Sequence, residues 1–174
     1  MPRLTCGTGL LPWSLLEGLV DGGRCLILGV AYPTMVREAV ERLRPKEVVV
    51  VETSHEVLDY ETKAVQGDVA VKPVFTRVIE RVVDLPSNSF DLVIAFNSLE
   101  KALQKRAFMT EVRRLLKENG RAVIATRLRT FLRRSGLGKK DFDNLLNTDG
   151  FRLEHKSVKR GQAVAVLTKS AKTY

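Results

Sequence analysis

The stretch from Arg24 to Glu52 constrains the fold more than any other part of this chain. Residues 24–28 have the pattern of a buried strand, which ends at Gly29 and is followed by a short turn. Apolar residues then recur three and four positions apart, as on one face of a helix, and residues 48–51 form a second buried strand. The order strand, turn, helix, strand, acid predicts a βαβ unit of the kind that binds adenosine-containing cofactors. In such units the turn brings backbone close to the ligand and the acid accepts hydrogen bonds from ribose hydroxyls.

Local signals predict where the helices of this region begin and end. Pro33 and Thr34 are typical of a helix start, because proline there loses no needed N–H and threonine caps free donors. Pro45 ends the helix. After the second strand, Thr53 and Glu56 have the spacing of a capping box, which predicts that another helix begins there.

The bulk composition indicates one folded domain. A chain of 174 residues with 44% hydrophobic content is globular, and no apolar run reaches the length of a membrane span. The N-terminus is a poor signal peptide, so we expect a cytoplasmic protein. The two cysteines form no disulfide framework and no metal-ligand spacing. We divide the single domain, 1–174, into a tail and helix at 1–23, a core at 24–168 and a tail at 169–174.

The net charge of +9, from 29 basic and 20 acidic residues, favours an anionic partner such as nucleic acid. Such a charge also keeps a protein soluble. The high charged fraction with few Gln and Asn is compatible with a heat-adapted source, in which much of the surface charge is structural.

The N-terminal region offers a weak motif and an aromatic residue. Residues 6–9, Cys-Gly-Thr-Gly, look like a cofactor loop but follow no strand. A short apolar helix then ends near Gly22 and Gly23. Trp13, at its start, either anchors this helix to the core or serves as a lid over a pocket.

The middle of the chain is ambiguous in one region, 66–83. Residues 68–72 alternate like a short strand, and 75–83 have the apolar spacing of a helix. The β-branched pairs Val78-Ile79 and Val82-Val83 make a strand there an alternative.

The second half alternates strands and helices, which predicts a mainly parallel sheet covered on both faces. Its final two strands are joined by a tight turn and form a hairpin, so the last strand is antiparallel to its neighbour. The expected elements are a strand at 91–96, a long helix from Ser98 to Lys117, a strand at 121–126, a short helix near 142–146, and strands at 151–158 and 163–168.

Three segments in this half carry a resemblance to a known family. Residues 85–93, Leu-Pro-Ser-Asn-Ser-Phe-Asp-Leu-Val, resemble the approach to the family's fourth strand. Residues 111–121 resemble the helix and turn before its fifth strand, and Gly150-Phe151 precedes a terminal hairpin like the family's own. The sequence is thereby similar to class I S-adenosylmethionine-dependent methyltransferases. The resemblance implies an α/β, Rossmann-like, doubly wound and mostly parallel seven-stranded sheet with an antiparallel C-terminal hairpin strand.

The same resemblance implies a cofactor, S-adenosylmethionine, and a set of site residues. Asn97, just past the fourth strand, would lie where the methyl group is presented and is the catalytic candidate. The cofactor-binding candidates are Gly29 and Ala31 in the loop, Glu52 and Thr53 at the ribose, and Asp68 or Asp84 at the adenine edge.

The first loop departs from the family pattern of two or three glycines. Here Gly29 is followed by Val30, Ala31, Tyr32 and Pro33. If one of these positions needs a positive φ, the strain is about 1–3 kcal/mol. Either the loop accepts the cofactor in an altered conformation, or Tyr32 fills the space.

Methyl transfer mainly requires alignment of two reactants, so the sequence need not contain an acid–base pair. His55 is either a base near the adenosine end or a surface residue. Cys25 lies in a core strand, which argues against a thiolate nucleophile. The Asn/Asp-Pro-Pro-aromatic motif of amino-group methyltransferases is absent after Asn97.

The basic segment 127–140 is the candidate acceptor-binding region. Phe131 lies among arginines that include Arg133 and Arg134, so a base could stack on it while guanidinium groups bind phosphates. The alternative is a solvated, heat-adapted loop. The sequence therefore supports two hypotheses: a methyltransferase, with RNA slightly favoured as acceptor, or a cofactor-free methyltransferase-like binding or assembly module.

Overall fold

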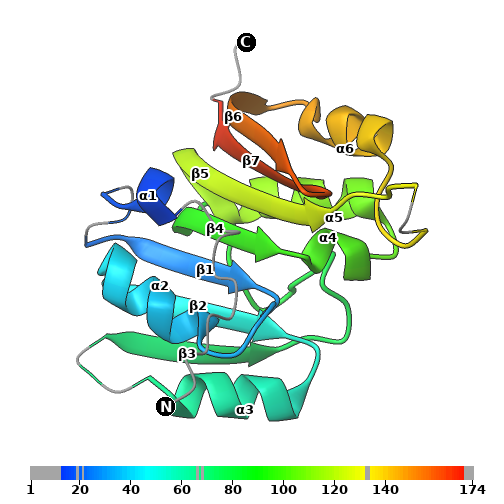
Figure 1. Ribbon diagram of the computed structural model, residues 1–174. Helices are drawn as coiled ribbons and strands as arrows, with labels where there is room; N and C mark the ends of the chain where they lie inside the picture. The colour runs from blue at the N-terminus through cyan, green and yellow to red at the C-terminus, as the bar shows by residue number, and fades with distance from the viewer. Residues whose placement is uncertain are drawn as a thin grey trace.

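A seven-stranded sheet lies between two layers of helices (Figure 1). The computed structural model describes residues 13–18, 20, 22–65, 67, 69–131 and 134–170. The strand order is β3-β2-β1-β4-β5-β7-β6, parallel from β3 to β5, with β7 antiparallel to both of its neighbours. The strands are β1 Arg24–Leu28, β2 Glu47–Glu52, β3 Ala70–Phe75, β4 Phe90–Phe96, β5 Leu116–Arg127, β6 Phe151–Lys159 and β7 Gln162–Lys169. The predicted fold class is confirmed.

The helices cover both faces of the sheet, as the nearly unbroken burial along the central strands β1, β2 and β4 requires. Leu26 and Leu28 belong to a core cluster shared with α4, α5 and α6, whereas Cys25 and Ile27 belong to the cluster under α1, α2 and α3. The helices are α1 Trp13–Leu16, α2 Met35–Leu43, α3 His55–Lys63, α4 Ser98–Lys101, α5 Lys105–Leu115 and α6 Lys139–Leu146.

The N-terminal helix is short, and Trp13 anchors it. The Trp13 side chain is buried with Leu16 and Val20 in the cluster under α2. This favours the anchor over the lid. The motif at residues 6–9 lies outside the described residues. None of the helices in the described ranges is long and apolar enough to span a membrane.

Neither a helix nor a strand follows β3, so both alternatives for 75–83 were wrong. Phe75 is the last residue of β3, and residues 76–89 form turns and bends. The reason is a clamp from α5: the Glu111 carboxylate accepts the Val82 N–H at 2.8 Å, and Arg114 donates to the carbonyls of Val82 and Leu85. These side chains satisfy backbone groups that a helix would otherwise pair internally.

The predicted long helix after β4 is broken into α4 and α5. Ala102 between them is extended, with φ −69° and ψ 129°. The Glu80 carboxylate accepts the N–H groups of Leu103 and Gln104, and so satisfies the free donors at the start of α5. Leu103, expected on the inner face, is exposed as a result.

Two helix caps also differ from the prediction. Thr34 makes no side-chain cap, and the N–H groups of Thr34 and Val36 instead donate to the buried carboxylate of Glu61 on α3. Helix α3 is capped by Ser54 instead of Thr53, because the Ser54 hydroxyl accepts the Val57 N–H. Thr53 is turned toward the preceding strand end.

The C-terminal hairpin is confirmed, with Arg160 and Gly161 both at positive φ in its two-residue turn.

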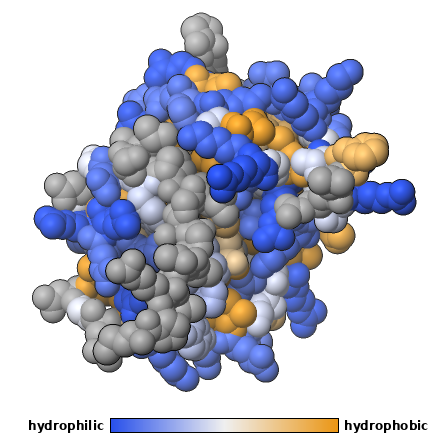
Figure 2. Space-filling view, viewed as in Figure 1, coloured by the Kyte–Doolittle hydropathy of each residue, from blue (hydrophilic) through white to orange (hydrophobic). Residues whose placement is uncertain are grey.

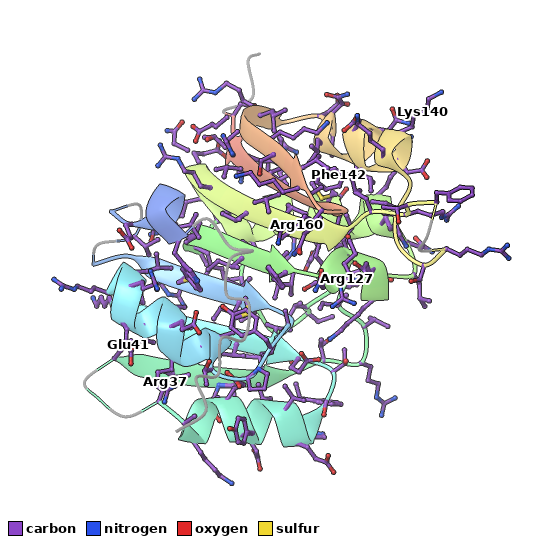
Figure 3. The ribbon with its side chains drawn as sticks, viewed as in Figure 1. Arg37, Glu41, Arg127, Lys140, Phe142 and Arg160 are labelled. Carbon is purple, nitrogen blue, oxygen red and sulfur yellow. The ribbon has the colours of Figure 1, made fainter. Side chains whose placement is uncertain are left out.

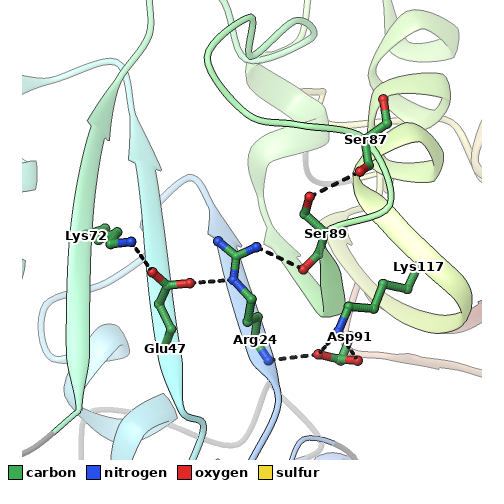
Figure 4. A network of polar contacts seen from close by, with 7 residues as sticks. All are labelled: Arg24, Glu47, Lys72, Ser87, Ser89, Asp91 and Lys117. Carbon is green, nitrogen blue, oxygen red and sulfur yellow. Dashed lines mark hydrogen bonds and ion pairs between the residues drawn. The ribbon is translucent and has the colours of Figure 1, made fainter.

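Figure 4 shows a polar network across the amino ends of the strands. Arg24 donates to Glu47, which also pairs with Lys72 at 2.5 Å, and the Arg24 N–H donates to Asp91 at 2.8 Å. This network fixes the strand ends on the side away from the candidate site.

Candidate cofactor and acceptor site

The candidate site lies at the carboxyl ends of β1, β2 and β4. The chain leaves β1 toward β2 on one side and returns to β4 on the other, which makes this the topological switch point of the sheet. Ligands of doubly wound sheets bind in the crevice at such a point. Gly29 follows β1, Glu52 ends β2 and Asn97 follows β4, so the fold brings these three predicted residues to one edge.

Glu52 faces the loop after β1. Its side chain is 2% exposed, and its Oε2 accepts the Val30 N–H at 2.8 Å. Its Oε1 accepts both the N–H and the hydroxyl of Thr53, at 2.7 and 3.1 Å. The Lys101 ammonium on α4 lies 3.8 Å from Oε2. Glu52 therefore joins the loop, its own strand end and α4 around one carboxylate.

Gly29 meets Ser98 across the switch point. Gly29 has φ +86°, and a Cβ built there would lie 2.5 Å from the Ser98 Oγ and 3.1 Å from Ile79. The Ser98 hydroxyl donates to the Leu28 carbonyl beneath it. Only glycine fits this position, because both the positive φ and the close hydroxyl exclude a side chain.

The rest of the loop is less strained than its sequence suggests. Among residues 29–34, positive φ occurs only at Gly29 and Thr34, at +86° and +75°. Ala31 therefore needs no glycine-like conformation. The strain falls on Thr34, a β-branched residue, whose N–H is held by Glu61 at 3.0 Å.

Tyr32 packs to the side of the loop that faces α2. Its ring lies edge-on against Phe96 with centroids 5.9 Å apart, and its hydroxyl donates to Glu38 at 3.1 Å. Burial, together with the Glu38 charge, raises the pKa of the Tyr32 phenol. The group that lies over Gly29 is the Ser98 hydroxyl and not this ring.

Asn97 has an unused acceptor. Its φ of +56° is left-handed, and its N–H donates to the Ala125 carbonyl at 2.7 Å. The side-chain Oδ1 is buried and has no hydrogen-bond partner among the described residues. Buried polar atoms are nearly always hydrogen-bonded, so this unpaired oxygen is available to accept a hydrogen bond from a ligand.

The two acids expected at the adenine edge do not lie beside Glu52 in the described part of the chain. His55 stacks on Phe75 with ring centroids 3.7 Å apart and an interplanar angle of 9°. Asp84 is exposed in the turn held by Arg114, and the structure does not bring it to Glu52. Asp68 lies outside the described residues.

Burial raises the pKa of the Cys25 thiol to about 12, so this cysteine is an inert core residue.

Three contacts around the loop had no local signal in the sequence. In the sequence, Ser98 is only the expected first residue of the long helix, and Lys101 and Glu61 belong to no motif. Each meets the loop or Glu52 through tertiary packing, as Glu61 does from α3. A buried acid on a helix beside a glycine-poor loop becomes recognisable only once the fold is known.

The basic segment leaves β5 beside this site. Arg127 and Arg160 lie at the carboxyl end of β5 and in the hairpin turn, Lys140 lies on α6, and Arg37 and Glu41 lie across the sheet on α2 (Figure 3). The Arg127 N–H donates to Glu100 of α4 at 2.7 Å. Helix α4 thus contacts Glu52 through Lys101 and the basic segment through Glu100. Arg133 lies outside the described residues.

These residues fit an adenosyl cofactor. A carboxylate has about four acceptor positions, and Val30 and Thr53 occupy three of those on Glu52. The remaining position on Oε2 and the unpaired Oδ1 of Asn97 can accept ribose or amine donors. Gly29 keeps the backbone free of a side chain at the switch point.

Comparisons with known proteins agree with this geometry. The family model described as "Methyltransferase domain" matches residues 26–124, more than half of the chain. No curated protein matches the sequence.

Solved structures share the fold at low sequence identity. A Haloferax volcanii methyltransferase in complex with the Trm112 activator is 10% identical, with a TM-score of 0.74 over 91% of this chain and 88% of that one. A Bacillus halodurans methyltransferase is 12% identical, with a TM-score of 0.71 over 91% and 97%. An S-adenosylmethionine-dependent methyltransferase from Mesorhizobium loti is 16% identical, with a TM-score of 0.73 over 90% and 95%. The chain belongs to the methyltransferase domain family, whose cofactor is S-adenosylmethionine.

Proposed function

We propose that this chain transfers a methyl group from S-adenosylmethionine to RNA. The observation that carries the proposal is the Glu52 carboxylate, which ends β2 and contacts the loop after β1 through the Val30 N–H. An acid in this place of a βαβ unit is suited to ribose hydroxyls. Its partners hold it in position before any ligand arrives, which reduces the entropy lost on binding.

The chain's own residues have to bind and align the two reactants. S-adenosylmethionine, when bound, supplies the electrophilic methyl group. Glu52 and Thr53 bind the ribose end, and Gly29 lets the ligand approach the backbone. Asn97 orients the reacting end through its unpaired Oδ1. Alignment of this kind contributes about 7–11 kcal/mol in favourable cases.

The charge distribution supports RNA as the acceptor over protein or a small molecule. The net charge is +9, and exposed cations gather where the chain leaves β5. Phosphate contacts by such groups dominate nucleic-acid affinity. The described cations of this surface are Arg127, Arg129, Arg134, Lys139 and Lys140.

A second candidate is a cofactor-free binding or assembly module. The observation that favours it is that the protein itself occupies much of the site: Glu52 holds Val30 and Thr53, and Ser98 covers Gly29. In that case these contacts would be permanent and the switch point would take no ligand. One related fold, the Haloferax methyltransferase, is solved with an activator protein, and an assembly role for this chain would be of that general kind.

Transfer of a labelled methyl group separates the candidates. The full chain is incubated with methyl-tritiated S-adenosylmethionine and, in parallel, with RNA, protein and small-molecule fractions of a cell extract. The proposal predicts that label enters RNA and that Asn97→Ala lowers its rate. Label found only in protein or small molecules would refute the RNA acceptor, and no transfer to any fraction would favour the module.

The cytoplasmic location and the heat-adapted source stay predictions from the sequence. Cell fractionation tests the first. The second predicts that thermal unfolding falls well above the range of about 45–65 °C typical of mesophile domains.

A further inference from the structure

The described residues between β5 and α6, 128–131 and 134–138, belong to a loop with a fixed base. Leu128 and Leu137 are buried and bridge to each other, with the Arg129 N–H donating to the Leu137 carbonyl at 2.8 Å. The Leu137 N–H donates to the Arg127 carbonyl at 3.0 Å. Gly136 has φ +114°, and a Cβ there would lie 2.8 Å from the Arg127 carbonyl oxygen. The base of the loop is therefore held by backbone bonds and by two core leucines.

Phe131, beyond this base, is entirely exposed. Its side chain is 100% accessible, more than any other large hydrophobic residue among those described. Figure 2 shows a hydrophobic protrusion bordered by hydrophilic side chains where this loop lies. The ring gains nothing from packing within the chain, and a flat exposed aromatic ring is a suitable surface for stacking a base.

A cationic pocket of about 480 Å³ lies beside the loop, between α5 and α6. It is lined by Lys105, Arg106, Arg129, Asp141 and Asn144, together with residues of the loop base. No ion pair joins Arg106 or Arg129 to a carboxylate within the described part of the chain. The Asp141 carboxylate is directed at the start of its own helix, since its Oδ2 would lie 2.6 Å from a Cβ on Gly138. The two guanidinium groups are thus available to an anion.

The pocket and the ring are close enough to contact neighbouring nucleotides. Arg129 lines the pocket, and Phe131 is two residues further along, so their Cα atoms are at most about 7 Å apart. The Arg129 Nη2 donates to the Gly136 carbonyl at 3.5 Å, which orients this guanidinium group. Helix α4 connects this region to Glu52, as described above.

We propose that this surface binds unpaired RNA, with a phosphate held by Arg106 and Arg129 in the pocket and the adjoining base stacked on Phe131. The inference rests on the proposed function, since this RNA would carry the methyl acceptor. Unpaired RNA is favoured because a base must leave its helix to stack on a side chain. An apolar protein partner would require a broader hydrophobic surface than one ring among unpaired cations.

Fluorescence anisotropy of the full chain with a labelled single-stranded oligoribonucleotide tests this. Phe131→Ala should weaken binding about 5- to 160-fold, the range measured for loss of base stacking. The double variant Arg106→Gln/Arg129→Gln should lower the slope of log affinity against log salt by about 0.7, because the two side chains hold one phosphate and each single-strand phosphate contact contributes about 0.7. The matched control is Arg37→Gln/Lys63→Gln, which removes two exposed cations paired with Glu41 and Asp59 on α2 and α3.

The control should leave both affinity and salt slope close to those of the wild type. Equal loss in the control, equal affinity for a fully paired duplex, or displacement by polyglutamate as effective as by RNA would overturn the proposal. Circular dichroism of each variant verifies the fold. Calorimetry with S-adenosylhomocysteine separates the two ideas: cofactor binding with unchanged RNA binding in the variants refutes this inference alone. RNA binding lost as predicted in a chain that takes no cofactor would refute the methyltransferase alone.

Discussion

The Glu52 carboxylate accepts the Val30 N–H at 2.8 Å, and so ties the end of β2 to the loop that follows β1. This bond joins the two parts of the βαβ unit that would contact an adenosyl group. It also explains how a loop with a single glycine keeps its conformation. The Glu52 carboxylate, which lies outside the loop, holds the backbone where further glycines would otherwise let it bend. The contact either prepares the site for a ligand or closes it, and measuring whether an adenosyl ligand binds separates these two outcomes.

Replacing Glu52 with Gln should destabilise the chain by about 2 kcal/mol. The amide keeps the shape but loses the charge, and one of its NH₂ donors would face the Val30 or Thr53 N–H. Hydrogen bonds to charged groups contribute about 1.5–3 kcal/mol. Urea unfolding measures the change. Glu56→Gln, at an exposed acid just beyond the same strand, is the control and should alter stability by less than about 0.5 kcal/mol. Equal stability of the two variants would show that the bonds to Glu52 contribute little.

Gly29→Ala should cost about 3 kcal/mol or more, because a clash with Ser98 adds to the strain of the positive φ. A positive φ alone costs an alanine about 1–2 kcal/mol. The new Cβ would also lie 2.5 Å from the Ser98 Oγ. Gly18→Ala is the matched control, since Gly18 has φ +84° against +86° and no atom within 4 Å of its built Cβ. The difference between the two unfolding free energies isolates the contacts with Ser98 and Ile79 from the cost of the positive φ.

A double variant tests the same contact from the other side. Ser98→Ala removes the oxygen that the Gly29→Ala methyl group would meet, so the pair should be more stable than the sum of the two single changes by about 1 kcal/mol. Strict additivity would mean that the Ser98 hydroxyl does not occupy the space above Gly29.

The network at the amino ends of the strands predicts an acid-sensitive stability. The hydrogen bond from Lys72, opposed by burial and aided by Arg24, lowers the pKa of Glu47 below its ordinary value of 4.5. A carboxyl group whose pKa is lowered by folding stabilises the protein above its unfolded pKa, and this contribution is lost as pH falls through the folded pKa. Glu47→Gln should therefore be less stable than the wild type near about pH 7, and this difference in stability should shrink as the pH falls below the ordinary pKa of 4.5.

Urea unfolding across that pH range measures the difference. Glu41→Gln is the control, because Glu41 is exposed and its oxygen lies 4.0 Å from Arg37. The unfolding free energy of Glu41→Gln should differ little from that of the wild type at every pH. A difference for Glu47→Gln that stays constant with pH would contradict the assigned role of the network.

Much of the architecture could be predicted from the sequence, because the buried strands and the terminal turn carry local signals. The apolar runs at 24–28, 48–51 and 91–96 and the Arg160-Gly161 turn correspond to observed elements. The placement of Gly29, Glu52 and Asn97 at one edge follows from the order of the strands.

The remaining features depend on contacts between distant parts of the chain. The absence of a helix after β3 depends on Glu111 and Arg114, which lie on α5. The break between α4 and α5 is accompanied by the contact with Glu80, and α2 is capped by Glu61 from α3. Periodicity within a window cannot report such tertiary partners. The same limit applied to the site, where Ser98 and Lys101 complete the surroundings of Gly29 and Glu52.

The central claim is that the switch point between β1 and β4 receives an adenosyl ligand. Isothermal titration calorimetry of the folded chain with S-adenosylhomocysteine tests it most directly. We expect saturable heat with a Kd of about 1 mM or tighter, equivalent to a binding free energy of about −4 kcal/mol or more favourable. We also expect weaker binding for Asn97→Ala. A folded protein that gives no binding heat at about 1 mM ligand would contradict binding of an adenosyl group at the switch point and leave only the methyltransferase-like architecture.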